Sequence, residues 1–314
     1  MKFIKTTLIA TLLSGTAFAQ NADKALARVR YSFSHMKDTT QRNNFYTENM
    51  LLVIGKNASV FTSYDKINRD EEIKKSIEEQ IKNQGGNLTS ININKSSSKP
   101  VTSADYFYFV NENKFYTKER LITNYLIEED VPKINWKINK DTLSFSGVKC
   151  QKATANFKGR KWIAWFAPDL PFQSGPWKLN GLPGLIVEAH DEKNEVKFQF
   201  AGIEKVAEED KSKVEEQTVT LGNGATGSVK LKGMDGSTYL GSEIKLPTDA
   251  VKTSQKDFDR LKEARDKDPQ GFINAQMGAN SGNMRVVQGT KFIPSSGDVK
   301  KIVFNNPIEL PEKK

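Results

Sequence analysis

One short stretch of the sequence combines residue types that could carry out acid/base chemistry or bind a metal ion. Glu188 and His190 are two positions apart, so in a β-strand they share one face, and Asp191 follows directly. A carboxylate and an imidazole are usable metal ligands, but two neighbouring ligands do not make a site, and the other histidine, His35, is far away in the sequence. We therefore interpret His190 as a surface histidine beside acids, and we expect no metal ion and no cofactor.

The single cysteine, Cys150, could in principle form a thiol–imidazole pair with His190. The sequence does not give the distance between them, and an exposed reactive thiol would be prone to oxidation. We favour the interpretation of Cys150 as a small, buried hydrophobic residue in a core strand. An alternative function nevertheless follows from Cys150, Glu188, His190 and Asp191, namely a hydrolase or a metal-dependent enzyme.

A stiff, hydrophobic segment between Ala167 and Gly184 is the stronger candidate site. Prolines at positions 168, 171, 176 and 183 exclude a regular helix or a central strand through most of it. Large apolar side chains on a rigid segment lose little conformational entropy on binding, which is typical of a recognition loop. The candidate residues for binding a ligand or partner are Trp165, Phe166, Phe172, Trp177, Leu179, Leu182 and Pro183.

The same aromatic side chains have a second, structural interpretation. They could plug one end of a sheet or barrel, with Gly181 and Gly184 permitting tight turns or close backbone contacts. A long run of exposed aromatic residues would be an aggregation hazard. We favour the plug and keep the recognition loop as the alternative.

Strand patterns surround these candidate residues. Apolar residues alternate with polar ones in several stretches, and short turn signals separate neighbouring stretches. The predicted hairpins join residues 49–54 to 59–64, 143–157 to 160–166, and 185–187 to 196–200. Two stretches show helical patterns instead: residues 70–83, with Ile73, Ile77 and Ile81 four positions apart, and residues 257–266, before Pro269.

These patterns predict a mainly β fold. We expect a large antiparallel curved sheet or an incomplete β-barrel of about ten strands, with two short helices. No linker stands out, so residues 20–314 are interpreted as one β-rich domain.

Residues 1–19 read as a signal peptide. Lys2 and Lys5 precede an apolar stretch, and Ala17-Phe18-Ala19 provides a small-x-small cleavage site before Gln20. The apolar stretch is shorter than the roughly 20 residues of a spanning helix, and no later segment reaches that length. We expect an exported chain, in the periplasm, at the periplasmic face of the outer membrane or secreted, that does not span a membrane.

The charge and cysteine content of the chain limit the kinds of partner that we expect. Cleavage removes Lys2 and Lys5 and lowers the net charge from +9 to +7. The lysines are scattered among acids, and an exported protein meets little nucleic acid, so nucleic acid is not an expected partner. A single cysteine cannot form an internal disulfide.

The segment from Asn180 to Ile186 resembles the defining hexapeptide of the GLPGLI family, a group of exported proteins found in Bacteroidetes. The motif itself is Gly181-Leu182-Pro183-Gly184-Leu185-Ile186. Further similarity lies in residues 50–55, 59–61, 147–153, 159–166 and 175–178. The resemblance covers residues 28–205, and Val148 departs from it because many relatives have an aromatic residue there.

The resemblance implies a signal peptide, a β-rich domain and an occurrence beside outer-membrane TonB-dependent receptors. It brings no catalytic residues to carry over. We therefore expect an exported binding or accessory protein that takes a hydrophobic ligand or peptide, or docks on an outer-membrane receptor, through residues 167–184 and the adjoining concave face.

Overall fold

The computed structural model describes residues 22–83, 87–88, 100–206, 218–221, 226–228, 239–248, 250–279 and 304–312. The predicted signal peptide, residues 1–19, lies outside the described residues. Among the helices that are described, none is long and apolar enough to cross a membrane.

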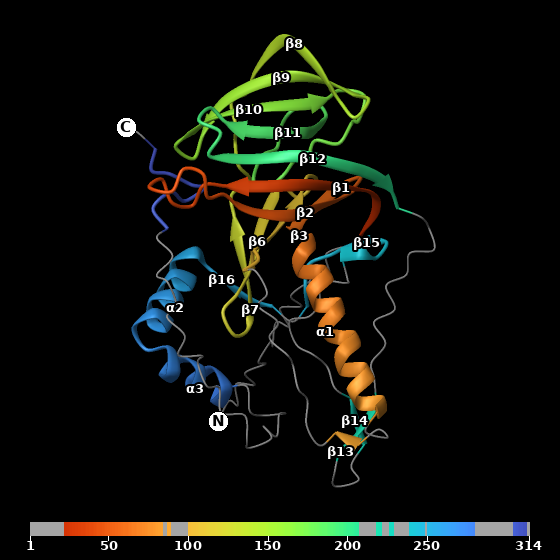
Figure 1. Ribbon diagram of the computed structural model, residues 1–314, viewed down its shortest axis with the longest axis vertical. Helices are drawn as coiled ribbons and strands as arrows, with labels where there is room; N and C mark the ends of the chain where they lie inside the picture. The colour runs from red at the N-terminus through yellow and green to blue at the C-terminus, as the bar shows by residue number, and fades with distance from the viewer. Residues whose placement is uncertain are drawn as a thin grey trace, which may run out of the picture.

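A large open sheet dominates the molecule. Thirteen strands form it, in the spatial order β16-β7-β6-β5-β3-β2-β1-β12-β11-β10-β9-β8, with β15 beside β1. Figure 1 shows that β8 to β12 run across the view with β1 and β2, whereas β6 and β7 run nearly at right angles to them. The prediction of a mainly β protein with a large, unclosed sheet is confirmed.

The strands of the main sheet have the following bounds. They are β1 (Asp23–His35), β2 (Tyr46–Gly55), β3 (Ala58–Ser63), β5 (Asp105–Phe109), β6 (Lys114–Arg120), β7 (Asn124–Glu129), β8 (Lys137–Phe145), β9 (Val148–Phe157), β10 (Arg160–Ala167), β11 (Leu185–Asp191), β12 (Val196–Lys205), β15 (Glu243–Ile244) and β16 (Val251–Thr253). A small second sheet contains β4 (Asn87–Leu88), β13 (Thr218–Leu221) and β14 (Thr226–Ser228).

Most neighbouring strands pair antiparallel, as their alternation and short turns predict. The exceptions are two parallel pairs, β16 with β7 and β13 with β4. Both join a strand of two to four residues to a strand far away in the sequence, so no local pattern could indicate them. The predicted arm 143–157 is divided between β8 and β9, because Ser146 and Gly147 have positive φ values of 48° and 86° and make a tight turn.

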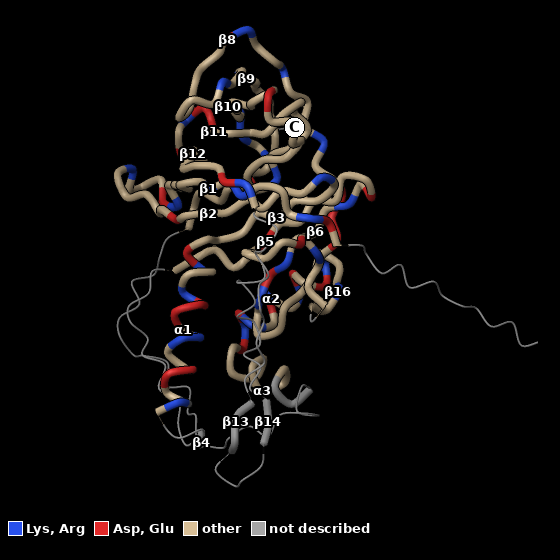
Figure 2. The backbone as a smooth tube through the Cα atoms, turned by 90° about the vertical axis from the view of Figure 1, so that its right-hand side faces the viewer, with Lys and Arg blue, Asp and Glu red and all other residues tan. Residues whose placement is uncertain are grey.

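Three helices accompany the sheets: α1 (Tyr64–Asn83), α2 (Gln255–Lys267) and α3 (Pro269–Ala279). Helix α1 starts six residues before the predicted position because Ser63 caps it, its Oγ accepting from the Lys66 N–H at 3.0 Å. Figure 2 shows acidic and basic residues along most of α1. Pro269 ends the predicted helix over 257–266 but also begins α3, a first-turn position that proline suits well.

Two hydrophobic cores lie on opposite faces of the central strands. The larger core lies between β1, β2 and β9 to β12 and contains Trp162, Trp177 and Phe198. The other packs under α1 and contains Ile67 and Phe107. Strand β2 is covered on both faces, which explains why residues 50–54 are a continuous apolar run without alternation.

Candidate functional site

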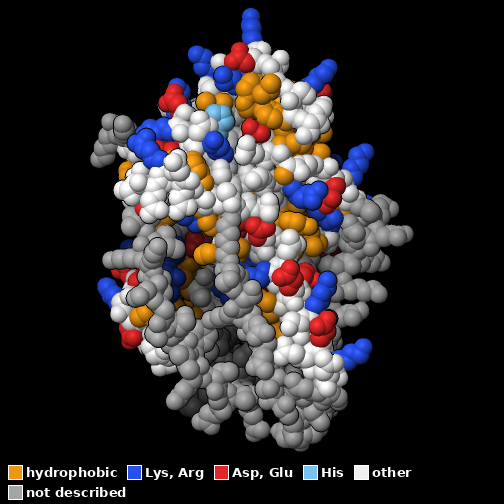
Figure 3. Space-filling model, in the orientation of Figure 1, with side chains coloured by type: hydrophobic (Ala, Val, Ile, Leu, Met, Phe, Trp, Pro, Cys, Tyr) orange, Lys and Arg blue, Asp and Glu red, His pale blue; other side chains and the backbone are white. Residues whose placement is uncertain are grey.

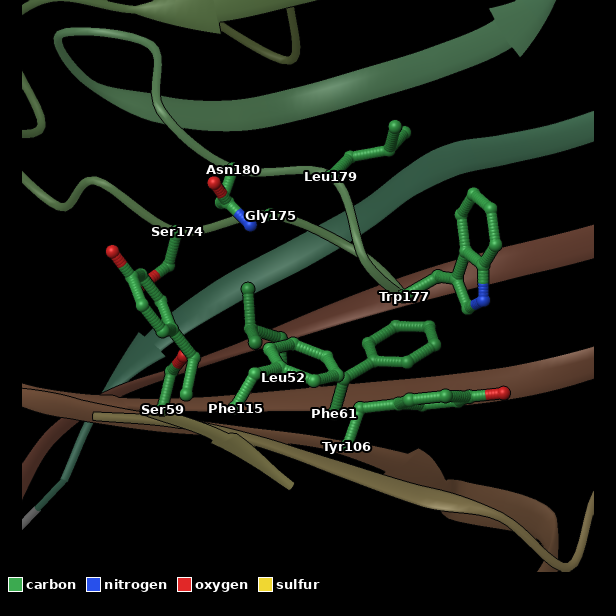
Figure 4. Close-up of a pocket in the computed structure, with 11 residues that line it drawn as sticks. Leu52, Ser59, Phe61, Tyr106, Phe115, Ser174, Gly175, Trp177, Leu179 and Asn180 are labelled. Carbon is green, nitrogen blue, oxygen red and sulfur yellow. The ribbon is translucent and has the colours of Figure 1, made fainter. Parts of the chain in front are cut away.

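A small hollow lies between residues 174–180 and strands β2, β3, β5 and β6 (Figure 4). It is lined by Leu52, Ser59, Phe61, Tyr106, Tyr108, Phe115, Ser174, Gly175, Trp177, Leu179 and Asn180. Its walls enclose about 240 Å³, partly open to solvent, which is below the roughly 300–1,000 Å³ of typical small-molecule sites. The space left between the side chains is close to that of one water molecule.

The hollow has a polar end and an aromatic end. Figure 4 shows Ser59, Ser174 and Asn180 toward one end, and Tyr106 and Trp177 at the other. Hydroxyl and amide groups beside aromatic faces suit a group that is apolar at its tip and polar where it leaves the hollow.

Strand register brings the aromatic wall together. Ser59 pairs with Tyr108 and Phe61 pairs with Tyr106 across β3 and β5, so these four side chains share one face of the sheet. The Phe61 and Tyr106 rings are 6.4 Å apart. Tyr106 and Tyr108 are two positions apart in β5 and therefore share a face, but nothing in the sequence indicates that this face meets residues 174–180.

Residues 168–184 have no regular secondary structure, as the prolines predict, and fold inward over the sheet. Backbone hydrogen bonds hold the segment against β11: Leu185 N–H donates to Leu170 O at 2.9 Å and Ile186 N–H donates to Ser174 O at 3.0 Å. The Trp136 indole N–H donates to Asn180 O at 2.8 Å. These bonds fix the segment as a wall of the hollow.

The predicted binding residues divide into core and partly exposed groups. Phe166, Leu179 and Leu182 are buried core residues. Trp177 is also buried, with its ring centroid 5.6 Å from that of Trp162 and 5.8 Å from that of Phe157. The partly or fully exposed members are Trp165, Phe172 and Pro183. Most of the large apolar side chains therefore belong to the larger core of the sheet.

The hexapeptide motif has a conformational role. Gly181 and Gly184 have positive φ values of 85° and 150°. A Cβ on Gly184 would lie 2.2 Å from Ala167 O, so only glycine fits this close approach. Leu182, Leu185 and Ile186 are buried, whereas Pro183 is exposed.

An ionic cluster lies behind the aromatic end of the hollow. Lys178 Nζ contacts Glu129 Oε2 at 2.6 Å and Glu309 Oε1 at 3.0 Å. Burial opposes the charge on Lys178, but the two carboxylates outweigh it and raise its pKa. Burial raises the pKa of the Tyr106 phenol, and nearby carboxylates add to the effect, so Tyr106 is neutral.

The predicted acid/base residues do not converge. Glu188 lies opposite Trp165, and His190 lies opposite Ile163, so both occupy the outer face as predicted from alternation. Asp191 points away from them: its carboxylate pairs with Arg160 Nη1 at 2.7 Å and accepts from the Glu195 and Val196 N–H groups.

Cys150 is buried, in agreement with its structural interpretation. Burial, assisted by the charge of Glu188, raises the pKa of its thiol to about 11, which disfavours the nucleophilic thiolate. Within the described part of the chain, no three His, Cys, Asp or Glu side chains are grouped so as to hold a metal ion.

A second polar cluster was missed from the sequence. Arg160 is buried and donates from Nε to Ile308 O at 2.9 Å, and from Nη2 to Asn306 Oδ1 and Pro307 O, both at 2.7 Å. His35 Nε2 lies 2.7 Å from Asn306 O, which only accepts, so this ring nitrogen carries the proton. The cluster seats residues 304–312 on the sheet, a contact across more than 140 positions that leaves no local signal.

Comparisons with known proteins identify a family for this chain and a weak structural similarity to solved structures. A family model described as "Protein of unknown function (Porph_ging)" matches residues 32–188, half of the chain. None of the curated proteins matches the sequence.

Two solved structures of PNGF-II, in different crystal forms, are similar in part. They have 13% and 10% sequence identity, TM-scores of 0.42 and 0.41, and alignments covering 62% and 75% of this chain. The chain spans about a third of the length of these structures, 30% and 32%.

Proposed function

The chain belongs to the Porph_ging family of proteins of unknown function, and we propose that it is an exported binding protein of the cell envelope rather than an enzyme. The observation that carries the proposal is the hollow between residues 174–180 and the aromatic face of β3, β5 and β6. The site's chemistry supports binding, because it offers aromatic faces, hydroxyls and an amide and places no reactive group among them.

The size of the hollow limits the size of the group that can bind in it. Tyr108, at its wall, is half-buried, and a rotation of such a side chain would open the narrow space. Once opened in this way, the hollow would suit one apolar or aromatic side chain, so the proposed ligand is a peptide or protein segment that anchors a single residue there.

The rigidity of residues 174–180 favours binding. The segment is held by backbone hydrogen bonds on one side and by Lys178, paired with Glu129, on the other. A wall that is already ordered loses little entropy when a ligand binds, so even a small contact contributes to affinity.

We also propose that the chain is one of the GLPGLI proteins, because the hexapeptide of residues 181–186 lies within the matched residues 32–188. The partner that this resemblance implies is an outer-membrane TonB-dependent receptor. The chain would then be its accessory protein at the periplasmic side of the membrane.

The test is a mild-detergent pull-down of the mature protein from its own cell envelope, with native mass spectrometry of the same sample. We expect a stoichiometric receptor or a retained peptide. Ser59→Leu fills the hollow without removing a core side chain, and it should abolish retention. Trp177 and Leu182 are unsuitable positions because both are buried in the core.

Ser32→Leu is the matched control. Ser32 lies on the face of β1 opposite to Tyr31 and Phe33, away from the hollow. Both variants should remain folded, and the urea midpoint of Ser59→Leu should be the lower one because a leucine overpacks this buried position. Equal retention by Ser59→Leu and wild type, with both folded, would contradict the proposal.

Metal analysis tests the enzyme alternative built on Cys150, Glu188, His190 and Asp191. We expect less than one metal ion per chain after purification, and no change in His190→Ala. A stoichiometric metal that this variant loses would favour the enzyme instead.

A further inference from the structure

A partly exposed apolar patch lies near the β8 edge of the sheet, made of one exposed leucine and three half-buried side chains that also pack against the larger core. We call it the tip patch, and it consists of Leu143, Phe145, Val148 and Trp165. Leu143 is 49% exposed, and the Phe145 and Trp165 rings meet edge to face with centroids 6.0 Å apart. Val148 pairs with Phe145 across the β8–β9 turn. Figure 3 shows hydrophobic side chains gathered on this upper part of the near face.

Lysines lie on the strands that carry the tip patch. Lys137, Lys140 and Lys149 are exposed, and no carboxylate among the described residues pairs with them. Lys152 lies with its Nζ 5.8 Å from the centre of the Trp165 ring and pairs with Asp141 at 3.2 Å. Figure 2 shows basic residues at the crest of β8, at the end of the molecule. Lysines therefore outnumber carboxylates on the strands of the patch, where Asp141 pairs with Lys152 and Glu188 lies opposite Trp165.

We propose that the tip patch docks the protein on an anionic lipid surface. Tryptophan and phenylalanine rings are favoured at the level of lipid headgroups, and an exposed leucine adds buried apolar area there. Lysines close to the surface attract anionic headgroups. The contact is peripheral, through one end of a sheet.

The charges favour a lipid surface over a second copy of the chain. A two-fold contact brings the same patch of each copy together. Each copy would then bring more lysines than carboxylates to the contact, and this excess of like charge opposes association. An anionic bilayer supplies the complementary charge.

The tip patch and the hollow are separate surfaces. Trp165 of the tip patch lies on the outer face of β10, whereas the neighbouring Phe166 belongs to the core on the inner face. Lipid docking thus leaves the hollow accessible and does not depend on its function.

Vesicle co-sedimentation of the mature protein tests the proposal. We expect binding to phosphatidylcholine vesicles that contain phosphatidylglycerol, little binding without it, and weaker binding at high salt. Replacing Lys137, Lys140 and Lys149 together by glutamine should weaken the affinity about five-fold per lysine, since each contributes about 1 kcal/mol. Leu143→Ser should also weaken it.

Matched control variants distinguish the effect of where a lysine lies from the effect of net charge on vesicle binding. Lys75→Gln, Lys82→Gln and Lys256→Gln together remove the same charge from exposed positions on α1 and α2, and they should weaken binding much less. Val251→Ser changes a comparably exposed side chain, 50% exposed, on β16, and it should have no effect.

Tryptophan quenching by brominated lipids reads the depth of contact. Trp162 and Trp177 are buried, and the half-buried Trp136 donates its indole N–H to Asn180 O beside the hollow, so we expect quenching in the wild type that is largely lost in Trp165→Phe. Absence of vesicle binding, equal losses in both lysine triples, or unquenched tryptophan emission would each overturn the proposal. So would a concentration-dependent dimer that the patch triple abolishes, because it would assign the patch to a second copy.

Discussion

Acidification should destabilise the folded chain through one buried histidine. His35 is 3% exposed, donates to Asn306 O at 2.7 Å, and packs beside the rings of Phe33 and Phe304. Burial is the main cause that lowers its pKa from 6.5 to about 4, and the nearby charges of Arg160 and Lys37 act in the same direction. The hydrogen bond to Asn306 opposes this shift but does not outweigh it.

The direction and the size of this loss of stability follow from the difference in proton binding between the folded and the unfolded chain. The unfolded chain binds a proton at His35 more readily than the folded chain does, so stability is complete above pH 6.5 and is lost as the pH falls toward 4. A difference of this size corresponds to about 3 kcal/mol in total, of which about 2 kcal/mol is lost between pH 7.5 and pH 5.

Urea unfolding at pH 7.5 and pH 5, followed by circular dichroism, measures this loss. His35→Gln keeps an N–H donor for Asn306 O but cannot be protonated, so its loss of unfolding free energy should be about 2 kcal/mol smaller than that of the wild type. His190→Gln is the control for replacing a histidine on the outer face. Equal losses in His35→Gln and wild type would refute the reasoning.

Three further predictions concern buried groups. Arg160→Ala should cost about 3–5 kcal/mol because it leaves the Asp191 carboxylate buried without its partner, and hydrogen exchange of residues 304–312 should accelerate. Gly184→Ala should destabilise more than Gly181→Ala, in thermal unfolding, because a Cβ meets Ala167 O only at position 184. Cys150 should react with iodoacetamide at pH 8 at least about 100-fold more slowly in the folded than in the unfolded chain; comparable rates would contradict its burial.

The sequence predicts those parts of the fold whose signal is local. Alternation and turn residues indicated the β2–β3 and β9–β10 hairpins, and the isoleucines of residues 73–81 indicated α1. Ile77 is buried, as this spacing predicts, and Ile73 is half-buried; the side chain of Ile81 lies outside the described part. The early start of α1 depends on Ser63, which caps the helix. Ser63 is also the last residue of β3, so no turn residues separate the strand from the helix and the helix start could not be located.

Contacts between distant segments could not be predicted. The seating of residues 304–312 on Arg160 and the pairing of β16 with β7 join segments more than 100 positions apart. A residue's type does not tell which distant backbone carbonyl it meets, so Arg160 reads as one more surface charge in the sequence although it is 5% exposed. The aromatic wall of the hollow was missed for the same reason.

The family hexapeptide illustrates how a sequence motif can be specific without carrying chemistry. Its leucines and isoleucine fill the core, and Gly184 allows the chain to pass Ala167 without a clash. These features turn the chain from β10 back into β11 and hold residues 174–180 over the sheet. The motif thus fixes one wall of the hollow, while the groups that a ligand would touch, such as Tyr108 and Ser59, lie outside it. The specificity of the proposed binding should therefore change with the residues that face residues 174–180, and Ser59→Leu is expected to alter retention while the motif stays intact.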